Sequence, residues 1–189
     1  MVRAALAAMA IAALLGLALA PSMAATYPQV TSSFDSLSST FTYRVTMLDT
    51  TTMYFGALKV NTHLPVGAFG LDITHPENYM TGAWVLDSNG SRISSLDWQT
   101  LIWDNGGNVT LHWLPKQGQS PIAPKANWVG EFDFKLPGVK AAMVSQSAQP
   151  LGGPGSYPLY DAWAPVPEPS SLAALGSLAG LFFVIRRKR

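Results

Sequence analysis

The sequence predicts an all-β protein, an antiparallel β-sandwich, between two terminal segments of different character. Three observations favour this fold class. Short runs rich in β-branched and aromatic residues alternate apolar and polar side chains with a period of two. Clusters of Asp, Asn, Gly and Pro separate these runs, as turns do. No stretch of ten interior residues has a convincing helical period. A closed β-barrel is the alternative architecture.

The expected strands follow one another along the interior of the chain. The clearest is 40–47, where aromatic and aliphatic residues alternate with Thr and Arg. The runs 98–103 and 109–114 flank Asp104-Asn-Gly-Gly-Asn108, which is a typical hairpin signal. The predicted strands are 40–47, 52–60 with a bulge at Gly56, 66–73, 83–86, 92–96, 98–103, 109–114, 128–136 and 140–145. Many short strands with turns between them favour a sandwich.

Both ends of this region differ from it in composition. Residues 26–39 are rich in Ser and Thr and are expected to form a mobile leader. Residues 147–165 are dense in Pro and Gly, which predicts a tether that lifts the domain off a membrane. A final strand that packs on the domain is an equal alternative for this segment. The domain itself is therefore expected at 25–146.

The N-terminus has the pattern of a secretory signal peptide. Arg3 precedes an apolar run over 4–20, and Ser22-Met23-Ala24 offers small residues at a cleavage site. We expect a signal peptide at 1–24, with cleavage after Ala24 and, as second choice, after Ala25. Such a signal predicts export of the domain through the Sec machinery.

The C-terminus predicts one transmembrane helix. Residues 170–185 are apolar and uncharged, and as a helix they would be about 24 Å long. This is shorter than a bilayer core of about 30 Å, so flanking side chains must extend the span. Four cations that can snorkel follow it, namely Arg186, Arg187, Lys188 and Arg189. By the positive-inside rule they keep the C-terminus cytoplasmic, in a single-pass inner-membrane precursor.

A short motif precedes this span. Val166 is followed by Pro167, Glu168 and Pro169, and the two prolines favour a stiff, extended backbone that a protease can bind. Together with the span and the cationic end, this segment resembles the PEP-CTERM sorting signal of Gram-negative bacteria. The resemblance covers 166–189 only. It implies recognition by a membrane-embedded exosortase, cleavage near the motif, and delivery to the cell surface or outside. An ordinary single-pass anchor is the alternative.

Composition limits the possible functions of the domain. Of 12 Lys+Arg and 11 Asp+Glu, five cations and one carboxylate lie in the terminal signals, so the mature region has a net charge of about −3. This charge gives no electrostatic support to nucleic-acid binding. Because the chain has no cysteine, disulfides, thiolate metal sites and cysteine nucleophiles are excluded.

Few residues in the domain suggest chemistry. No catalytic or nucleotide-binding motif is present, and we expect no enzyme activity and no cofactor. The densest polar cluster is Asp72, His75 and Glu77, a weak candidate for a metal or an acid/base site. The simpler interpretation is a solvated loop in which Pro76 fixes a turn. His63 and His112 are expected at the surface.

These observations predict an exported surface or matrix protein with a non-catalytic structural or adhesive role. A carbohydrate-binding module is the first alternative, because exposed Trp and Tyr can stack on sugar rings and the resemblance associates exosortase systems with exopolysaccharide and biofilm. Core packing is nevertheless the expectation for Trp98, Trp103, Trp113 and Trp128. An extracytoplasmic hydrolase is the second alternative; it would require carboxylates and a histidine in one cleft.

Overall fold

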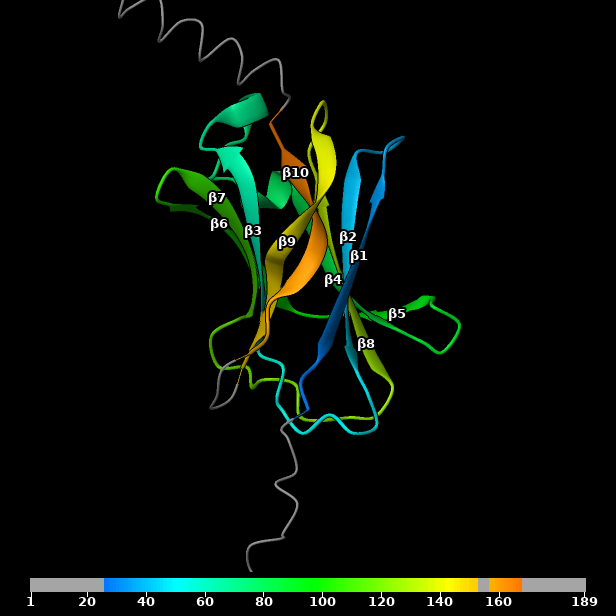
Figure 1. Cartoon of the computed structure of the whole chain (residues 1–189). Coiled ribbons are helices and arrows are strands. Elements are labelled where there is room, and N and C mark those ends of the chain that lie inside the picture. The colour runs from blue at the N-terminus through cyan, green and yellow to red at the C-terminus, as the bar shows by residue number, and fades with distance from the viewer. Residues whose placement is uncertain (1–25, 153–156, 168–189) are drawn as a thin grey trace, which may run out of the picture.

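The computed structural model of the chain describes residues 26–152 and 157–167. These residues form two five-stranded antiparallel sheets that pack face to face (Figure 1). The strands are β1 (Gln29–Asp35), β2 (Thr40–Met47), β3 (Ala57–Pro65), β4 (Met80–Leu86), β5 (Arg92–Ser95), β6 (Trp98–Asn105), β7 (Asn108–Pro115), β8 (Trp128–Lys135), β9 (Lys140–Leu151) and β10 (Tyr160–Val166). One sheet has the order β1-β2-β8-β4-β5 and the other β10-β9-β3-β7-β6. The predicted antiparallel sandwich is therefore confirmed, and the alternative of a closed barrel is wrong.

The segments with the clearest sequence patterns form the predicted strand and hairpin. β2 has the predicted bounds, and its apolar residues Phe41, Tyr43, Val45 and Met47 are all buried. In the β6–β7 hairpin the turn is formed by Gly106 and Gly107, with φ of 69° and 93°. Asp104 Oδ1 accepts a hydrogen bond of 2.7 Å from the Gly107 backbone N–H. Glycine is required here because both turn positions need positive φ.

The predictions of a leader and a tether are wrong for the described residues. β1 lies within the supposed leader and pairs with β2 over its whole length. β9 continues to Leu151, and β10 pairs with it as the final strand, which was the alternative for this segment. The inward residues of β10 include Ala162 and Ala164, which are buried but small. A strand that fills its core side with alanine shows little hydrophobic alternation, so its composition is that of a linker.

The prediction of a strand at 66–73 is also wrong. This segment holds a single turn of 3-10 helix, η1 (Ala68–Gly70), and a second turn, η2 (Pro76–Asn78), follows before β4. Gly67 and Gly70 have φ of 77° and 71°, which a continuous strand does not allow. The strand before it is displaced as well, because β3 begins at Ala57 rather than at the predicted residue 52.

The core between the sheets is built largely from aromatic rings. Phe55 lies 5.3 Å from Trp98 and 5.8 Å from Phe132, measured between ring centroids, and Trp113 lies 5.8 Å from both Phe132 and Tyr43. Each such side chain stabilises the fold by about 2 to 3 kcal/mol through burial. Tyr43 Oη and Trp113 Nε1 are buried and have no hydrogen-bond partner among the described residues, so the core favours packing over polar pairing.

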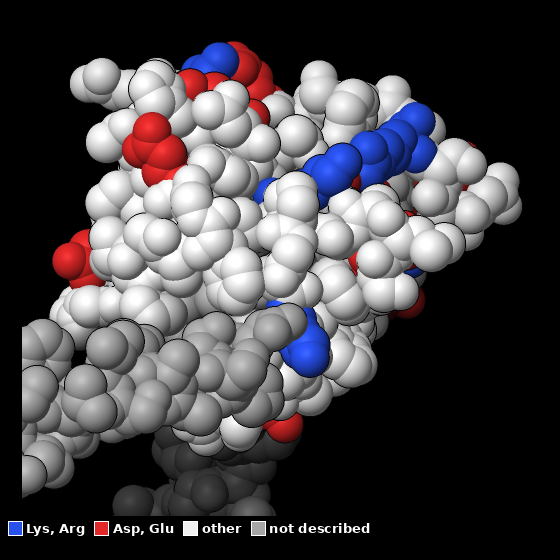
Figure 2. Space-filling model, turned by 90° about the horizontal axis from the view of Figure 1, so that it is seen from above, with Lys and Arg blue, Asp and Glu red and all other residues white. Residues whose placement is uncertain are grey.

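The two ends of the sandwich differ in which termini they carry. β1 and β10 lie side by side across the sheets, and the Trp163 backbone N–H donates to Ser32 Oγ at 2.8 Å. Both strands run in the same direction, so Thr26 lies at one end and Val166 at the other (Figure 1). We call the end with Val166 the exit end; it also carries the β1–β2, β3–β4 and β8–β9 connections. Seen from this end, uncharged residues cover most of the surface (Figure 2).

Candidate functional site

The predicted sorting motif begins inside the last strand. Pro165 pairs with Ala141 and Val166 with Lys140, so no free linker separates the sandwich from Pro167. The remaining predicted sorting and processing residues lie outside the described residues: Glu168, Pro169, the span 170–185, Arg186, Arg187, Lys188, Arg189, and the cleavage-site residues Ala24 and Ala25. Within 26–152 and 157–167, no helix is long and apolar enough to cross a membrane.

The polar loop before β4 brings together two of its three candidate residues. His75 Nδ1 lies 2.9 Å from Glu77 Oε1, while Asp72 Oδ1 instead accepts hydrogen bonds from the N–H and Oγ1 of Thr74. The pKa of His75 is raised by the bond to Glu77 and then by the charge of Asp72. All three side chains are exposed. No group of three His, Asp or Glu side chains in the described part of the chain could hold a metal ion.

An exposed tryptophan distinguishes the outer face of the second sheet. Trp103 on β6 is 49% exposed, so the expectation that it packs in the core is wrong, whereas Trp113 and Trp128 are buried as predicted. Its ring centroid lies 4.3 Å from that of His112, at an interplanar angle of 37°. Cross-strand neighbours on this face include Thr110 and Lys59. We call the four residues Trp103, Thr110, His112 and Lys59 the Trp103 face.

His112 is buried within this face, so the prediction of a surface histidine is wrong for it. Only 5% of the residue is exposed, because Trp103 from the next strand covers the imidazole. Its Nε2 lies 3.2 Å from Thr110 Oγ1. Burial, and secondarily the charge of Lys59, lowers the pKa of His112 to about 4. The imidazole is therefore neutral at physiological pH and acts as a flat support for the indole. His63 on β3 is exposed, as predicted.

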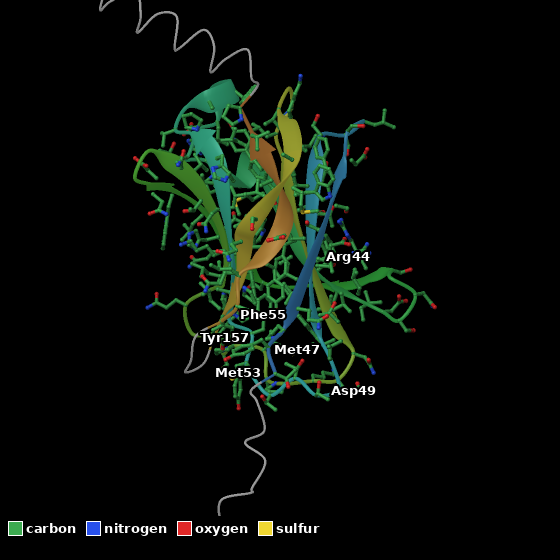
Figure 3. The ribbon with its side chains drawn as sticks, in the orientation of Figure 1. Arg44, Met47, Asp49, Met53, Phe55 and Tyr157 are labelled. Carbon is green, nitrogen blue, oxygen red and sulfur yellow. The ribbon has the colours of Figure 1, made fainter. Side chains whose placement is uncertain are left out.

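A charged cluster lies on the outer face of the first sheet, and sequence analysis did not find it. Glu131 and Asp133 on β8 are each 5% exposed. Glu131 accepts bonds of 2.8 Å from Arg44 on β2 and from Arg92 on β5. Arg92 also bonds Asp133, and its guanidinium carbon lies 5.2 Å from the centroid of the Trp84 ring. In Figure 3 Arg44 points away from the space between the sheets. The sequence shows two acids at an i, i+2 spacing on one strand, but the arginines that bond them can be identified only from the register between strands.

This cluster ties strands together rather than presenting free acids. Thr42 Oγ1 donates to Asp133 Oδ1 at 2.9 Å, so that carboxylate has both a hydroxyl and an arginine partner. Burial raises the pKa of Asp133, and this effect outweighs the bonds from Thr42 and Arg92 that lower it. The buried histidine, His112, lies on the opposite sheet. The described residues thus bring these carboxylates together with arginines and not with a histidine.

Comparison with known proteins decides the nature of the C-terminal segment. Residues 165–189 match the family described as the PEP-CTERM protein-sorting motif. The chain carries a PEP-CTERM sorting motif. This motif implies a precursor that passes into the membrane, processing by an exosortase, and export to the surface. The match begins at Pro165, within β10. No curated protein and no solved structure matches the chain.

Proposed function

We propose that this protein is a non-catalytic structural or adhesive component of the cell surface or extracellular matrix. In this proposal the Sec machinery exports the sandwich, the span 170–185 holds it in the inner membrane with a cytoplasmic C-terminus, and an exosortase releases it. One observation carries the proposal: the PEP-CTERM match at 165–189 continues directly from the last strand of a complete sandwich. The sandwich is thus the cargo that the motif delivers.

Alanine replacement tests the processing step. The triple variant Pro167→Ala, Glu168→Ala, Pro169→Ala is expected to stay full-length in the membrane fraction, because it lacks the rigid acidic segment that the protease would bind. The matched control changes the exposed residues Pro124 and Lys125 to alanine, which removes a proline and a charge from another loop. The control should be processed like the natural chain. Unchanged processing of the triple variant would refute the exosortase assignment.

Only two carboxylates are buried in the described part of the chain, and their bonding partners are consistent with a non-catalytic role. Glu131 and Asp133 both bond arginines, and Asp133 also accepts a bond from Thr42. A hydrolase that uses two acids needs one that can give up a proton and one that can act as nucleophile or base. Arginines close to both acids occupy the oxygens that such a reaction would use. A hydrolase on this scaffold would be established by release of reducing sugar or peptide that is lost in Glu131→Gln.

A second candidate function is binding of an exopolysaccharide through the Trp103 face. A half-exposed indole that rests on a buried imidazole is a rigid apolar surface for the ring of a sugar. Lys59 lies on the same face, where its ammonium group can donate hydrogen bonds to sugar hydroxyls or carboxylates, whereas the Thr110 hydroxyl is buried and bonds within the protein. This combination of one exposed aromatic ring with an adjacent ammonium group favours a glycan over a purely apolar ligand.

Gel retardation with the polysaccharide of the producing cell tests this candidate. Trp103→Ala is expected to weaken retardation about tenfold, because stacking energy is lost while the sheet remains. The matched control is Ile93→Ala, which removes an exposed apolar side chain from the other sheet. Quenching or shift of tryptophan fluorescence should accompany binding in the natural chain and the control. Equal retardation of both variants, or none for the natural chain, excludes the Trp103 face as a glycan site.

A further inference from the structure

The exit end of the sandwich presents apolar side chains from two connections. Leu37 in the β1–β2 turn is 98% exposed, and Val66 and Phe69 in the β3–β4 connection are about two-fifths exposed. Phe69 has φ 54° and ψ 24°, a left-handed conformation that costs a residue with a side chain roughly 1 to 2 kcal/mol. The positive-φ residues Gly67 and Gly70 flank it. The connection thus holds an aromatic side chain outward at a conformational cost.

The length of chain beyond β10 fixes what this end can approach. Val166 is still paired with Lys140, and the predicted span begins at residue 170. Four residues reach at most about 14 Å when fully extended. The polar layer of a bilayer is about 5 to 8 Å thick on each side. The end of β10 is therefore held within about 9 Å of the headgroups whenever the span is in the membrane.

The loops of this end reach the same level as the point where the chain leaves β10 (Figure 1). Seen end-on, acidic side chains lie mainly toward the margin, and uncharged residues cover most of the surface (Figure 2). Such a surface can rest in the headgroup region, because its apolar side chains gain free energy there while the exposed carboxylates of the same connections, Asp35, Asp72 and Glu77, stay in the hydrated part of that layer.

We propose that Leu37, Val66 and Phe69 form a bilayer-contacting face, on which the sandwich stands end-on in the outer leaflet of the inner membrane until the precursor is cut. This inference rests on the proposed membrane-anchored precursor. The occupant is the lipid bilayer itself, because the short chain between Val166 and the span holds this end beside the headgroups. Cutting at the sorting motif removes the constraint and releases this face.

Single-cysteine labelling tests the inference on the uncut precursor. The natural chain has no cysteine, so one introduced thiol is the only labelling position. The precursor is produced without exosortase and reconstituted in vesicles of phosphatidylethanolamine and phosphatidylglycerol that contain a nitroxide-labelled lipid. The variants Leu37→Cys and Val66→Cys place an environment-sensitive fluorophore at the exit end. Leu159→Cys, 43% exposed beside the start of β10, is the matched control at the opposite end.

The expected result is quenching of the Leu37 and Val66 labels at least about twofold stronger than that of the Leu159 label. Equal, weak quenching at all three positions in vesicles that retain the protein overturns the inference and leaves the proposed anchoring intact. Strong quenching at all three positions overturns the end-on arrangement. Precursor that does not float with the vesicles and is extracted by alkaline carbonate refutes the membrane anchor, and with it this inference.

Discussion

Replacement of His112 by glutamine tests how the Trp103 face responds to acid. The imidazole is covered by Trp103, hydrogen-bonded through Nε2 to Thr110, and paired across the strands with Lys59. Burial of the imidazole, and secondarily the positive charge of Lys59, disfavours protonation and lowers the pKa of His112 to about 4. An unfolded chain binds the proton with a pKa of about 6.5.

The sign and size of the effect follow from these two pKa values. Because the pKa is lower in the folded state, the neutral imidazole contributes stability above about pH 6.5, and that stability is lost as the pH falls towards 4. Complete expression of the difference would reduce the free energy of unfolding by about 3 kcal/mol between pH 7 and pH 4. Since the face borders solvent, we expect about 2 kcal/mol after screening.

Urea unfolding monitored by tryptophan fluorescence measures this loss in a chain that ends at Pro167. The carboxylates titrate in the natural chain and in His112→Gln alike, so the difference between the two pH dependences isolates the histidine. His112→Gln should lose about 2 kcal/mol less than the natural chain between pH 7 and pH 4. The control His63→Gln, at an exposed position of β3, should behave as the natural chain does. Parallel losses in all three chains would show that the folded protein accepts the proton without cost.

Two further substitutions test the sheets. Arg92→Ala should reduce the free energy of unfolding by about 3 kcal/mol in the same urea assay, because it removes a cation from both buried acids, Glu131 and Asp133. Arg44→Ala should reduce it less, because Arg44 pairs only with Glu131, which keeps Arg92. Tyr43→Phe removes a buried hydroxyl that has no partner among the described residues, so we expect stability to be unchanged or raised by about 1 kcal/mol, and a large loss would reveal an unrecognised hydrogen bond.

The elements that could be predicted from sequence are those with large residues on one face and polar residues on the other. β2 is the clearest case, since Phe41, Tyr43 and Val45 are separated by residues that face solvent or bond β8. The Gly106-Gly107 turn could be predicted equally well, because two adjacent glycines favour the positive φ angles that a short hairpin turn needs. For such segments the local pattern and the tertiary environment agree.

The wrong predictions concern residues whose burial depends on packing between strands and not on the local sequence pattern. β1 and β10 meet across the sheets, where the Trp163 backbone N–H bonds Ser32 Oγ and β10 buries only the small residues Ala162 and Ala164. Small inward residues give β10 the composition of a linker, whereas in β1 the inward residues Val30 and Phe34 stand among Ser and Thr, which hid the strand pattern. His112 was predicted at the surface because it alternates with apolar residues along its strand, but Trp103 on the neighbouring strand covers it. Its burial depends on the β6–β7 register, which a single strand does not encode.

The position of β10 restricts where the precursor can be cut. The pairs from Tyr160 to Val166 hold β9 in place, and the same strand buries Ala162 and Ala164 against the core. A cut before Val166 would remove part of this strand and expose the paired edge of β9, which favours aggregation. The processed protein should therefore end at Pro167 or later, as read by mass spectrometry of its C-terminal peptide. A chain stopped after Leu159 should fail to give cooperative unfolding, whereas one stopped after Pro167 should unfold cooperatively. If the shorter chain also folds, β10 does not constrain the cleavage position, and the sorting motif alone sets it.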